Sequence, residues 1–292
     1  MMGVCIGVAF IIPGFSGGSI AAILGIYERL VGAIANILHD FKNSVRTLLP
    51  IGVGLVLGAV ALMFPIGFFL DRYPIMTVSL FVGLAIGGIP SLKDKIKGKP
   101  TVNNITSLVI PAIITALISF MPVGEDVNLF GLSIGGYVLL FLVGVIGSCA
   151  LVVPGISGSM LLLILGYYNP ILRLVTDNLL RFENVLTSVL VLGVCGIGVA
   201  VGFFVISVLM KALLEKYPRG TYFAIIGFII GSLPTIYVST MKDAGMISHS
   251  FEIISLPSSP LNYVISVLLT IVGITLSYGF VRMASKKQGK TE

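Results

Sequence analysis

The sequence predicts an all-α polytopic membrane protein built from an inverted-topology repeat, each half a broken or re-entrant helix pair plus three transmembrane helices. Of the 292 residues, 57% are hydrophobic and only 10% are charged, with a mean hydropathy of +1.10. A soluble globular protein carries about 25% charged residues, which it needs to cover its surface. The composition therefore excludes soluble enzymes, and the chain has no basic patch interleaved with aromatic residues of the kind that binds nucleic acid.

Apolar segments bounded by charged or turn residues recur along the whole chain, which we treat as one membrane domain over residues 1–292. A transmembrane helix needs about 20 apolar residues, so the length allows about eight to ten spans. The segments are 3–12, 19–38, 48–70, 75–92, 105–121, 132–153, 159–174, 185–213, 221–238 and 261–281. The N-terminal segment lacks a basic region and a cleavage site, so we assign it to the fold and not to a signal peptide.

An internal repeat relates the two halves of the chain. Residues 13–27 (PGFSGGSIAAILGIY) match residues 154–168 (PGISGSMLLLILGYY) at a constant offset of 141. After an insertion of three residues, the match resumes at an offset of 144, where Tyr73-Pro74 aligns with Tyr217-Pro218. We assign residues 1–128 to repeat 1, residues 129–285 to repeat 2 and residues 286–292 to a basic cytoplasmic tail.

The number of spans and the positive charges predict how the repeats are oriented. If each PGxSG break joins two arms that enter and leave on one side, three further spans separate the two pairs and place them on opposite sides. Thirteen Lys and Arg residues then fall on one side and four on the other, with Arg29 left out. The richer side comprises Lys42, Arg46, Lys93, Lys95, Lys97, Lys99, Lys211, Lys216, Arg219, Arg282, Lys286, Lys287 and Lys290. Because cytoplasmic loops carry an excess of Lys and Arg, this side and both termini are predicted to be cytoplasmic.

The two PGxSG breaks are the predicted binding site. Proline and glycine end one helix, and Ser16 and Ser157 stand where the N-cap of the next helix belongs. The free N–H groups of such a helix start favour anions, and paired broken helices in an inverted repeat indicate a substrate site. The expected substrate-binding residues at the breaks are Pro13, Gly14, Ser16, Gly17, Gly18, Ser19, Pro154, Gly155, Ser157, Gly158 and Ser159. The alternative is that the breaks are tight turns whose glycines serve only helix packing.

Glu28 and Arg29 are charged residues embedded between apolar ones close to the first break. Such residues are costly in a membrane and usually serve a function, so Glu28 is a candidate proton carrier and Arg29 a candidate phosphate ligand. The alternative places both at the cytoplasmic headgroup level, with Arg29 reaching toward water. Cys5, Cys149 and Cys195 lie in apolar runs without ligand spacing, so we expect neither a metal nor another cofactor.

The string from Ile12 to Glu28, with its second copy from Val153 to Tyr168, resembles the prokaryotic polyprenyl-phosphate transporter family (PopT). The resemblance covers essentially the whole chain and implies a multi-pass protein of a prokaryotic cell (plasma) membrane. It further implies that the partner is a polyprenyl-phosphate lipid, such as undecaprenyl phosphate, moved from the outer to the cytoplasmic leaflet for reuse. The second copy departs from the pattern, because Ser159-Met160 replaces Gly18-Ser19.

Two other functions compete with a lipid transporter that binds phosphate at paired helix starts. A channel or exchanger for small inorganic anions would use the same kind of anion site. An enzyme that processes lipids within the membrane is disfavoured, because His39 and His249 lie in connectors and no acidic metal-binding motif is present. We therefore expect a transporter without catalytic residues.

Overall fold

The computed structural model describes residues 2–9, 11–12, 16–179, 184–246, 253–254 and 260–288, and these residues are predominantly helical. The first half contains α1 (Met2–Ala9), α2 (Gly17–Ile23), α3 (Tyr27–Ala35), α4 (Phe41–Arg72), α5 (Pro74–Gly88), the 3₁₀ helix η1 (Ile89–Ile96) and α6 (Val102–Ser119). The second half contains α7 (Ile134–Val152), α8 (Gly158–Ile164), α9 (Tyr168–Arg173), the π-helix η2 (Leu174–Leu179), α10 (Val185–Lys216), α11 (Pro218–Asp243) and α12 (Pro260–Gln288).

Within the described part of the chain, seven helices are long and apolar enough to cross a membrane. They are α4, α5 with η1, α6, α7, α10, α11 and α12. In addition, α8 and the segment Tyr168–Thr176 form a pair bent by 109°. The prediction of an all-α polytopic membrane protein is therefore confirmed.

The repeat seen in the sequence is also a repeat of helix packing. The helices α4 and α10 each contain 32 residues, and both end at a Tyr-Pro pair that starts the next helix. A Cβ on Gly7 would meet the Leu55 carbonyl oxygen at 2.2 Å, and one on Gly144 would meet that of Cys195 at 2.4 Å. Small residues thus bring α1 against α4 and α7 against α10 in the same way.

The last two helices of each repeat pack across the repeat boundary. Gly83 and Gly87 of α5 lie against Thr270 and Ile274 of α12, whereas Gly227 and Gly231 of α11 lie against Leu108 and Ala112 of α6. Each glycine lies so close to a carbonyl of the other helix that an added Cβ would approach it within 2.4 Å. Each repeat therefore depends on the other for its packing.

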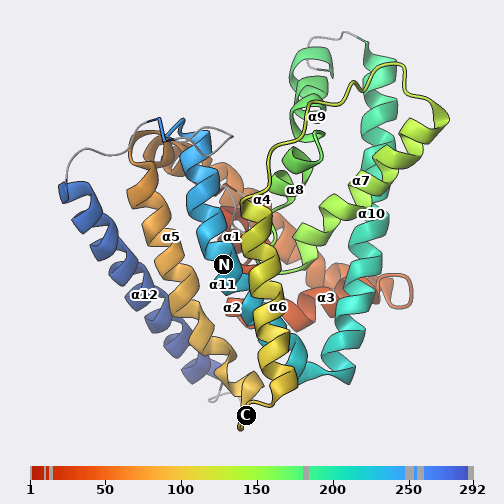
Figure 1. Cartoon of the computed structure of the whole chain (residues 1–292). Helices are drawn as coiled ribbons and strands as arrows, with labels where there is room; N and C mark the ends of the chain where they lie inside the picture. The colour runs from red at the N-terminus through yellow and green to blue at the C-terminus, as the bar shows by residue number, and fades with distance from the viewer. Residues whose placement is uncertain are drawn as a thin grey trace.

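Two contacts show that the repeats are inverted. Near the start of α5, the Ser79 hydroxyl lies 2.9 Å from the Tyr237 hydroxyl near the end of α11. Beyond the end of α5, the carbonyl of Lys99 accepts a 2.6 Å hydrogen bond from Arg219 at the start of α11. The equivalent helices α5 and α11 are therefore antiparallel neighbours, as Figure 1 also shows.

The apolar segments after the two breaks differ from the prediction, because neither forms a single arm. Segment 19–38 is divided into α2 and α3 at Gly25, and segment 159–174 is divided into α8 and α9 at Gly166. Both glycines have positive φ angles, +69° and +76°, which residues with a Cβ rarely adopt. The sequence did not predict these interruptions at Gly25 and Gly166, because an isolated glycine in an apolar run is also common inside transmembrane helices.

The C-terminal helix also differs from the predicted boundary. Helix α12 continues to Gln288, so the backbone of residues 286–288 of the predicted tail is helical. Residues 289–292 lie outside the described part of the chain. The boundary between the repeats at residues 128 and 129 stays a prediction.

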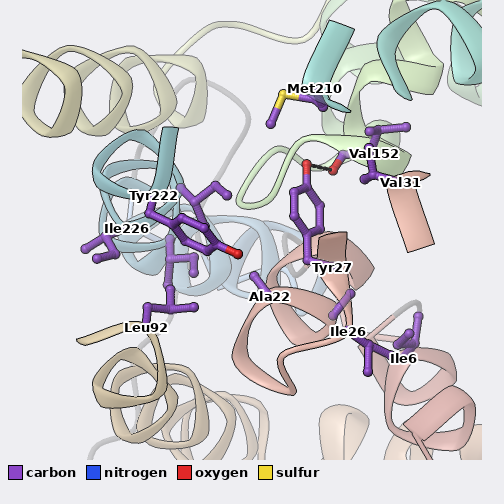
Figure 2. Close-up of a cluster of buried hydrophobic side chains, with 13 residues drawn as sticks. Ile6, Ala22, Ile26, Tyr27, Val31, Leu92, Val152, Met210, Tyr222 and Ile226 are labelled. Carbon is purple, nitrogen blue, oxygen red and sulfur yellow. Dashed lines mark hydrogen bonds between the residues drawn. The ribbon is translucent and has the colours of Figure 1, made fainter. Parts of the chain in front are cut away.

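The core where the repeats meet contains side chains from both halves. Figure 2 shows Tyr27 of α3 and Ala22 of α2 beside Val152 of α7, Met210 of α10 and Tyr222 of α11. The Tyr27 hydroxyl donates a 2.9 Å hydrogen bond to the Val152 carbonyl. This bond ties the broken segment of repeat 1 to the residues that precede the break of repeat 2.

Candidate functional site

The structure brings the two breaks together. Ser16 is the N-cap of α2 and Ser157 is the N-cap of α8, as the sequence predicts. The Ser16 hydroxyl lies 3.4 Å from both the Ala150 and the Val153 carbonyl oxygens, just before the second break. A Cβ on Gly18 would lie 3.0 Å from the Val152 carbonyl oxygen, so this glycine permits the close approach.

A pocket of about 280 Å³ lies between the breaks. Its polar side chains are Ser16, Ser157, Ser159, Tyr168 and Asp243, and Gly17 and Gly158 expose backbone there. The remaining lining residues are Ile11, Ile12, Ala150, Leu151, Ile156 and Leu163. A small group of polar atoms in an apolar wall is typical of a ligand site.

The second break supplies most of this polar lining. The Ser157 hydroxyl accepts a 3.5 Å hydrogen bond from the Met160 N–H and lies 3.1 Å from the Ser159 hydroxyl. Pro154 is fully buried, so it shapes the turn without lining the pocket. Gly155 has a φ of +82°, and an added Cβ would lie 2.2 Å from the Phe228 carbonyl oxygen on α11. Glycine is therefore required there by both conformation and space.

The first break is more deeply buried. Ser19 is only 1% exposed, and its hydroxyl makes no hydrogen bond within the described residues. A buried hydroxyl without a partner costs free energy. Ser19 and Gly18 do not line the pocket themselves. Two predicted ligands, Pro13 and Gly14, lie outside the described residues.

An anion in the pocket would be bound mainly by hydrogen bonds from nearby N–H and O–H groups. The dipoles of α2 and α8 would contribute less, because both helices are short. Helices α2 and α8 have only seven residues each, about two turns. The first N–H groups of a helix lack an acceptor one turn earlier in their own helix. The Ser19 and Met160 N–H groups are already bonded to the N-cap residues, which leaves the N–H groups before them as the candidates for binding a ligand. The Ser157 and Ser159 hydroxyls, 3.1 Å apart, add a further donor, because only one of them is needed to donate to the other. The Ser16 proton is instead directed to the Ala150 and Val153 carbonyls.

Two lining residues, Tyr168 and Asp243, were not predicted from the sequence. Tyr168 starts α9 after the unexpected break at Gly166, and Asp243 is the last residue of α11. The sequence places Asp243 in a polar connector, far from the breaks. Only the position of α11 beside the second break could have revealed it.

Glu28 belongs to a different polar cluster. Its carboxylate accepts hydrogen bonds from Lys95 at 2.9 Å and from Tyr222 at 2.5 Å, joining α3 to η1 and α11. Partial burial raises the pKa of Glu28, but the bonds from Tyr222 and Lys95 outweigh it and hold the pKa below its ordinary value. In this conformation Glu28 is therefore a paired carboxylate, about half exposed.

Arg29 does not reach the pocket. It is exposed on α3 and is not among the lining residues. The break residues and Glu28 thus occupy two separate places, connected through the short helices α2 and α3. The roles of Arg29 in phosphate binding and of Glu28 in proton transfer stay predictions.

These features define a class of protein: a multi-pass membrane protein with inverted repeats, whose broken helices meet around a polar pocket. Such an arrangement is typical of transporters that bind substrate near the membrane midplane. Residues 6–254 match the family described as VCA0040-like, undecaprenyl phosphate translocase-like, and the chain belongs to this family. Neither the curated proteins nor the solved structures that were compared with the chain gave a match.

Proposed function

We propose that the protein moves undecaprenyl phosphate or a related polyprenyl phosphate from the outer to the cytoplasmic leaflet of a prokaryotic plasma membrane. The observation that carries the proposal is the meeting of the two breaks around one pocket with serine hydroxyls and free helix-start amides. A phosphate group needs several such donors, and in this family the lipid named is undecaprenyl phosphate. The headgroup would bind in the pocket while the chain stays among apolar side chains or lipid.

The arrangement of the pocket and the basic residues supports this direction of transport. The pocket lining extends to Tyr168 and Asp243, on the side of Arg173 and Asp126, whose side chains form a 3.3 Å ion pair. The opposite end carries Lys95, Arg219 and Lys211, which the excess of positive charge assigns to the cytoplasm together with the termini. The conformation would therefore be open toward the outer leaflet.

On the cytoplasmic side, the Glu28 cluster would have to open for release. Protonation of Glu28 removes its charge attraction for Lys95 and weakens the bonds that it accepts from Lys95 and Tyr222, so proton uptake and opening would be coupled. Transport driven by a proton gradient would then end when the cluster opens and the headgroup reaches the cytoplasmic surface. This gives the proton-carrier role of Glu28 a structural mechanism.

Reconstitution into liposomes tests this function against that of a channel for inorganic anions. We expect fluorescent polyprenyl phosphate to change leaflets in liposomes that contain the protein, at a rate above that of protein-free liposomes. A membrane-impermeant quencher measures the lipid left in the outer leaflet, and a chloride or phosphate electrode measures efflux from the same preparation. Rapid anion efflux without lipid movement would replace the lipid transporter with an anion channel or exchanger.

A further inference from the structure

A second cavity, of about 410 Å³, lies on another side of α2. It is formed by α1, α2, α5 and α12, and its walls include Val8, Ile20, Ile23, Phe81 and Leu84. Apart from Cys5 and Ser277, the side chains that line it are apolar. Its volume is within the range of about 300–1,000 Å³ found for small-molecule sites.

The cavity is accessible to hydrocarbon from the membrane. Leu276 of α12 lines it and is 59% exposed, so its outer wall faces the lipid. The inner wall is closely packed, because Ala9 is only 1% exposed and the Ile23 side chain lies directly against Gly88. A cavity with a fixed apolar inner wall and an edge in the bilayer fits a flexible hydrocarbon chain and not a polar ligand.

The same two segments border this cavity and the pocket at the breaks. On α2, Gly17 lines the polar pocket, whereas Ile20 and Leu24 line the apolar cavity. On the segment before the break, Ile11 and Ile12 line the pocket, whereas Val8 and Ala9 line the cavity. Gly17 and Leu24 are seven positions apart, which corresponds to about 10 Å along a helix. One amphiphilic molecule could therefore occupy both sites.

We propose that this cavity binds the isoprenoid units nearest the phosphate of the polyprenyl phosphate whose headgroup occupies the pocket. The inference rests on the proposed function and adds a site that distinguishes lipids by their isoprenoid chain. Phosphate alone would occupy only the pocket. A lipid with both parts would gain affinity from the burial of its chain against Ile20, Ile23 and Phe81.

Cys5 allows a direct test, because its half-buried thiol lines the cavity. We would label a Cys149→Ala, Cys195→Ala variant, which retains only Cys5, with a membrane-permeant maleimide. Farnesyl phosphate at saturation should slow the labelling at least fivefold, whereas inorganic phosphate should leave the rate unchanged. Equal labelling in the presence of bound farnesyl phosphate would overturn the proposal.

A second variant tests whether the chain contributes affinity. Ser277→Leu should fill part of the cavity and weaken farnesyl phosphate binding about tenfold in calorimetry, without changing the binding of inorganic phosphate. Thr275→Leu is the matched control, since Thr275 is exposed on the same helix and lies outside the cavity lining. Unchanged farnesyl phosphate affinity in a folded Ser277→Leu protein would also overturn the proposal. Should that variant not fold, the Cys5 labelling decides alone.

The outcomes separate the cavity from the pocket. If the parent protein bound neither inorganic phosphate nor farnesyl phosphate, the proposed function would fail. If both bound but Cys5 stayed unprotected, only the chain site would fail. Equal protection by decanoic acid, which lacks a phosphate, would make the cavity a general site for membrane acyl chains and would overturn its assignment to polyprenyl phosphate.

Discussion

The two broken helices occupy equivalent places in the repeats, but their surroundings differ. In α2, six of the seven residues are buried, whereas in α8 only Met160 is buried. The Ser16 hydroxyl points to carbonyls of the other repeat, while the Ser157 hydroxyl stays with Ser159 and its own helix. We infer that α2 is the fixed wall of the pocket and that α8 is the wall able to adjust to a ligand.

The contacts beyond the breaks reinforce this contrast. On the side of repeat 1, α3 is anchored by Tyr27 to Val152 and by Glu28 to Lys95 and Tyr222. On the side of repeat 2, the turn at Gly166 is covered by a connector, whose Gly124 and Val127 N–H groups donate to Leu163 and Gly166. An inverted repeat can thus give two similar sequences different mechanical roles.

The largest expected effect is that of Gly155→Ala. The alanine would have to adopt a φ near +82° and would place its Cβ 2.2 Å from the Phe228 carbonyl oxygen. Gly25→Ala is the matched control, because its φ is +69° but nothing lies within 4 Å of the added Cβ. We expect Gly25→Ala to cost about 1–2 kcal/mol of left-handed strain and Gly155→Ala clearly more. Thermal unfolding in detergent measures both, and equal melting temperatures would contradict the close approach of α11 to the break.

A large effect on energy coupling is expected from Glu28→Gln. The lowered pKa means that the ion pair with Lys95 is complete above the ordinary carboxyl pKa and is lost only as the pH falls through the lower, folded-state value. Near neutral pH, Glu28 should therefore take up a proton only when the cluster opens. Glu28→Gln should bind the lipid normally but lose the response of transport to a pH gradient. The same gradient response in both proteins, in a leaflet-resolved liposome assay, would exclude Glu28 as the proton carrier.

An effect of the opposite sign is expected from Asp243→Asn. A carboxylate in the pocket repels a phosphate dianion, so its neutralisation should strengthen binding. We expect the dissociation constant of inorganic phosphate to fall severalfold at pH 7.5, measured by calorimetry. Glu125→Gln, a neutralisation outside the pocket lining, controls for net charge. Weaker binding by Asp243→Asn would show that the aspartate supports the ligand.

The smallest effects come from the serines at the two N-cap positions, Ser16 and Ser157. Ser16→Ala should lower stability by about 1 kcal/mol, because it removes a hydroxyl bonded across the repeats. Ser157→Ala should weaken phosphate binding by a similar amount, since it removes a donor from the pocket. Melting temperature and binding affinity, measured on both variants, distinguish these roles. If both variants showed the same changes in melting temperature and in affinity, the two breaks would not differ in role.

The sequence predicted the parts of the fold that follow from composition and duplication. Membrane segments, the repeat and the N-caps at Ser16 and Ser157 depend on local residues, which the chain displays directly. The pairing of α5 with α12 and of α6 with α11 depends on glycines that meet residues far away in the sequence. This pairing of helices from different repeats also determines the contacts of Glu28 with Lys95 and Tyr222 and the place of Asp243 in the pocket. These contacts therefore could not be predicted from the sequence.

Hydrogen–deuterium exchange with farnesyl phosphate tests the central claim, that phosphate binds where the two breaks meet. Without ligand, the amides of residues 157–159 at the start of α8 should exchange quickly and those of the buried α2 slowly, because the next two amides of α8 are already bonded to Ser157. Saturating farnesyl phosphate should slow exchange in residues 157–159 at least tenfold, and only slightly in residues 17–23. Unchanged exchange in residues 157–159 with the ligand bound would contradict the account.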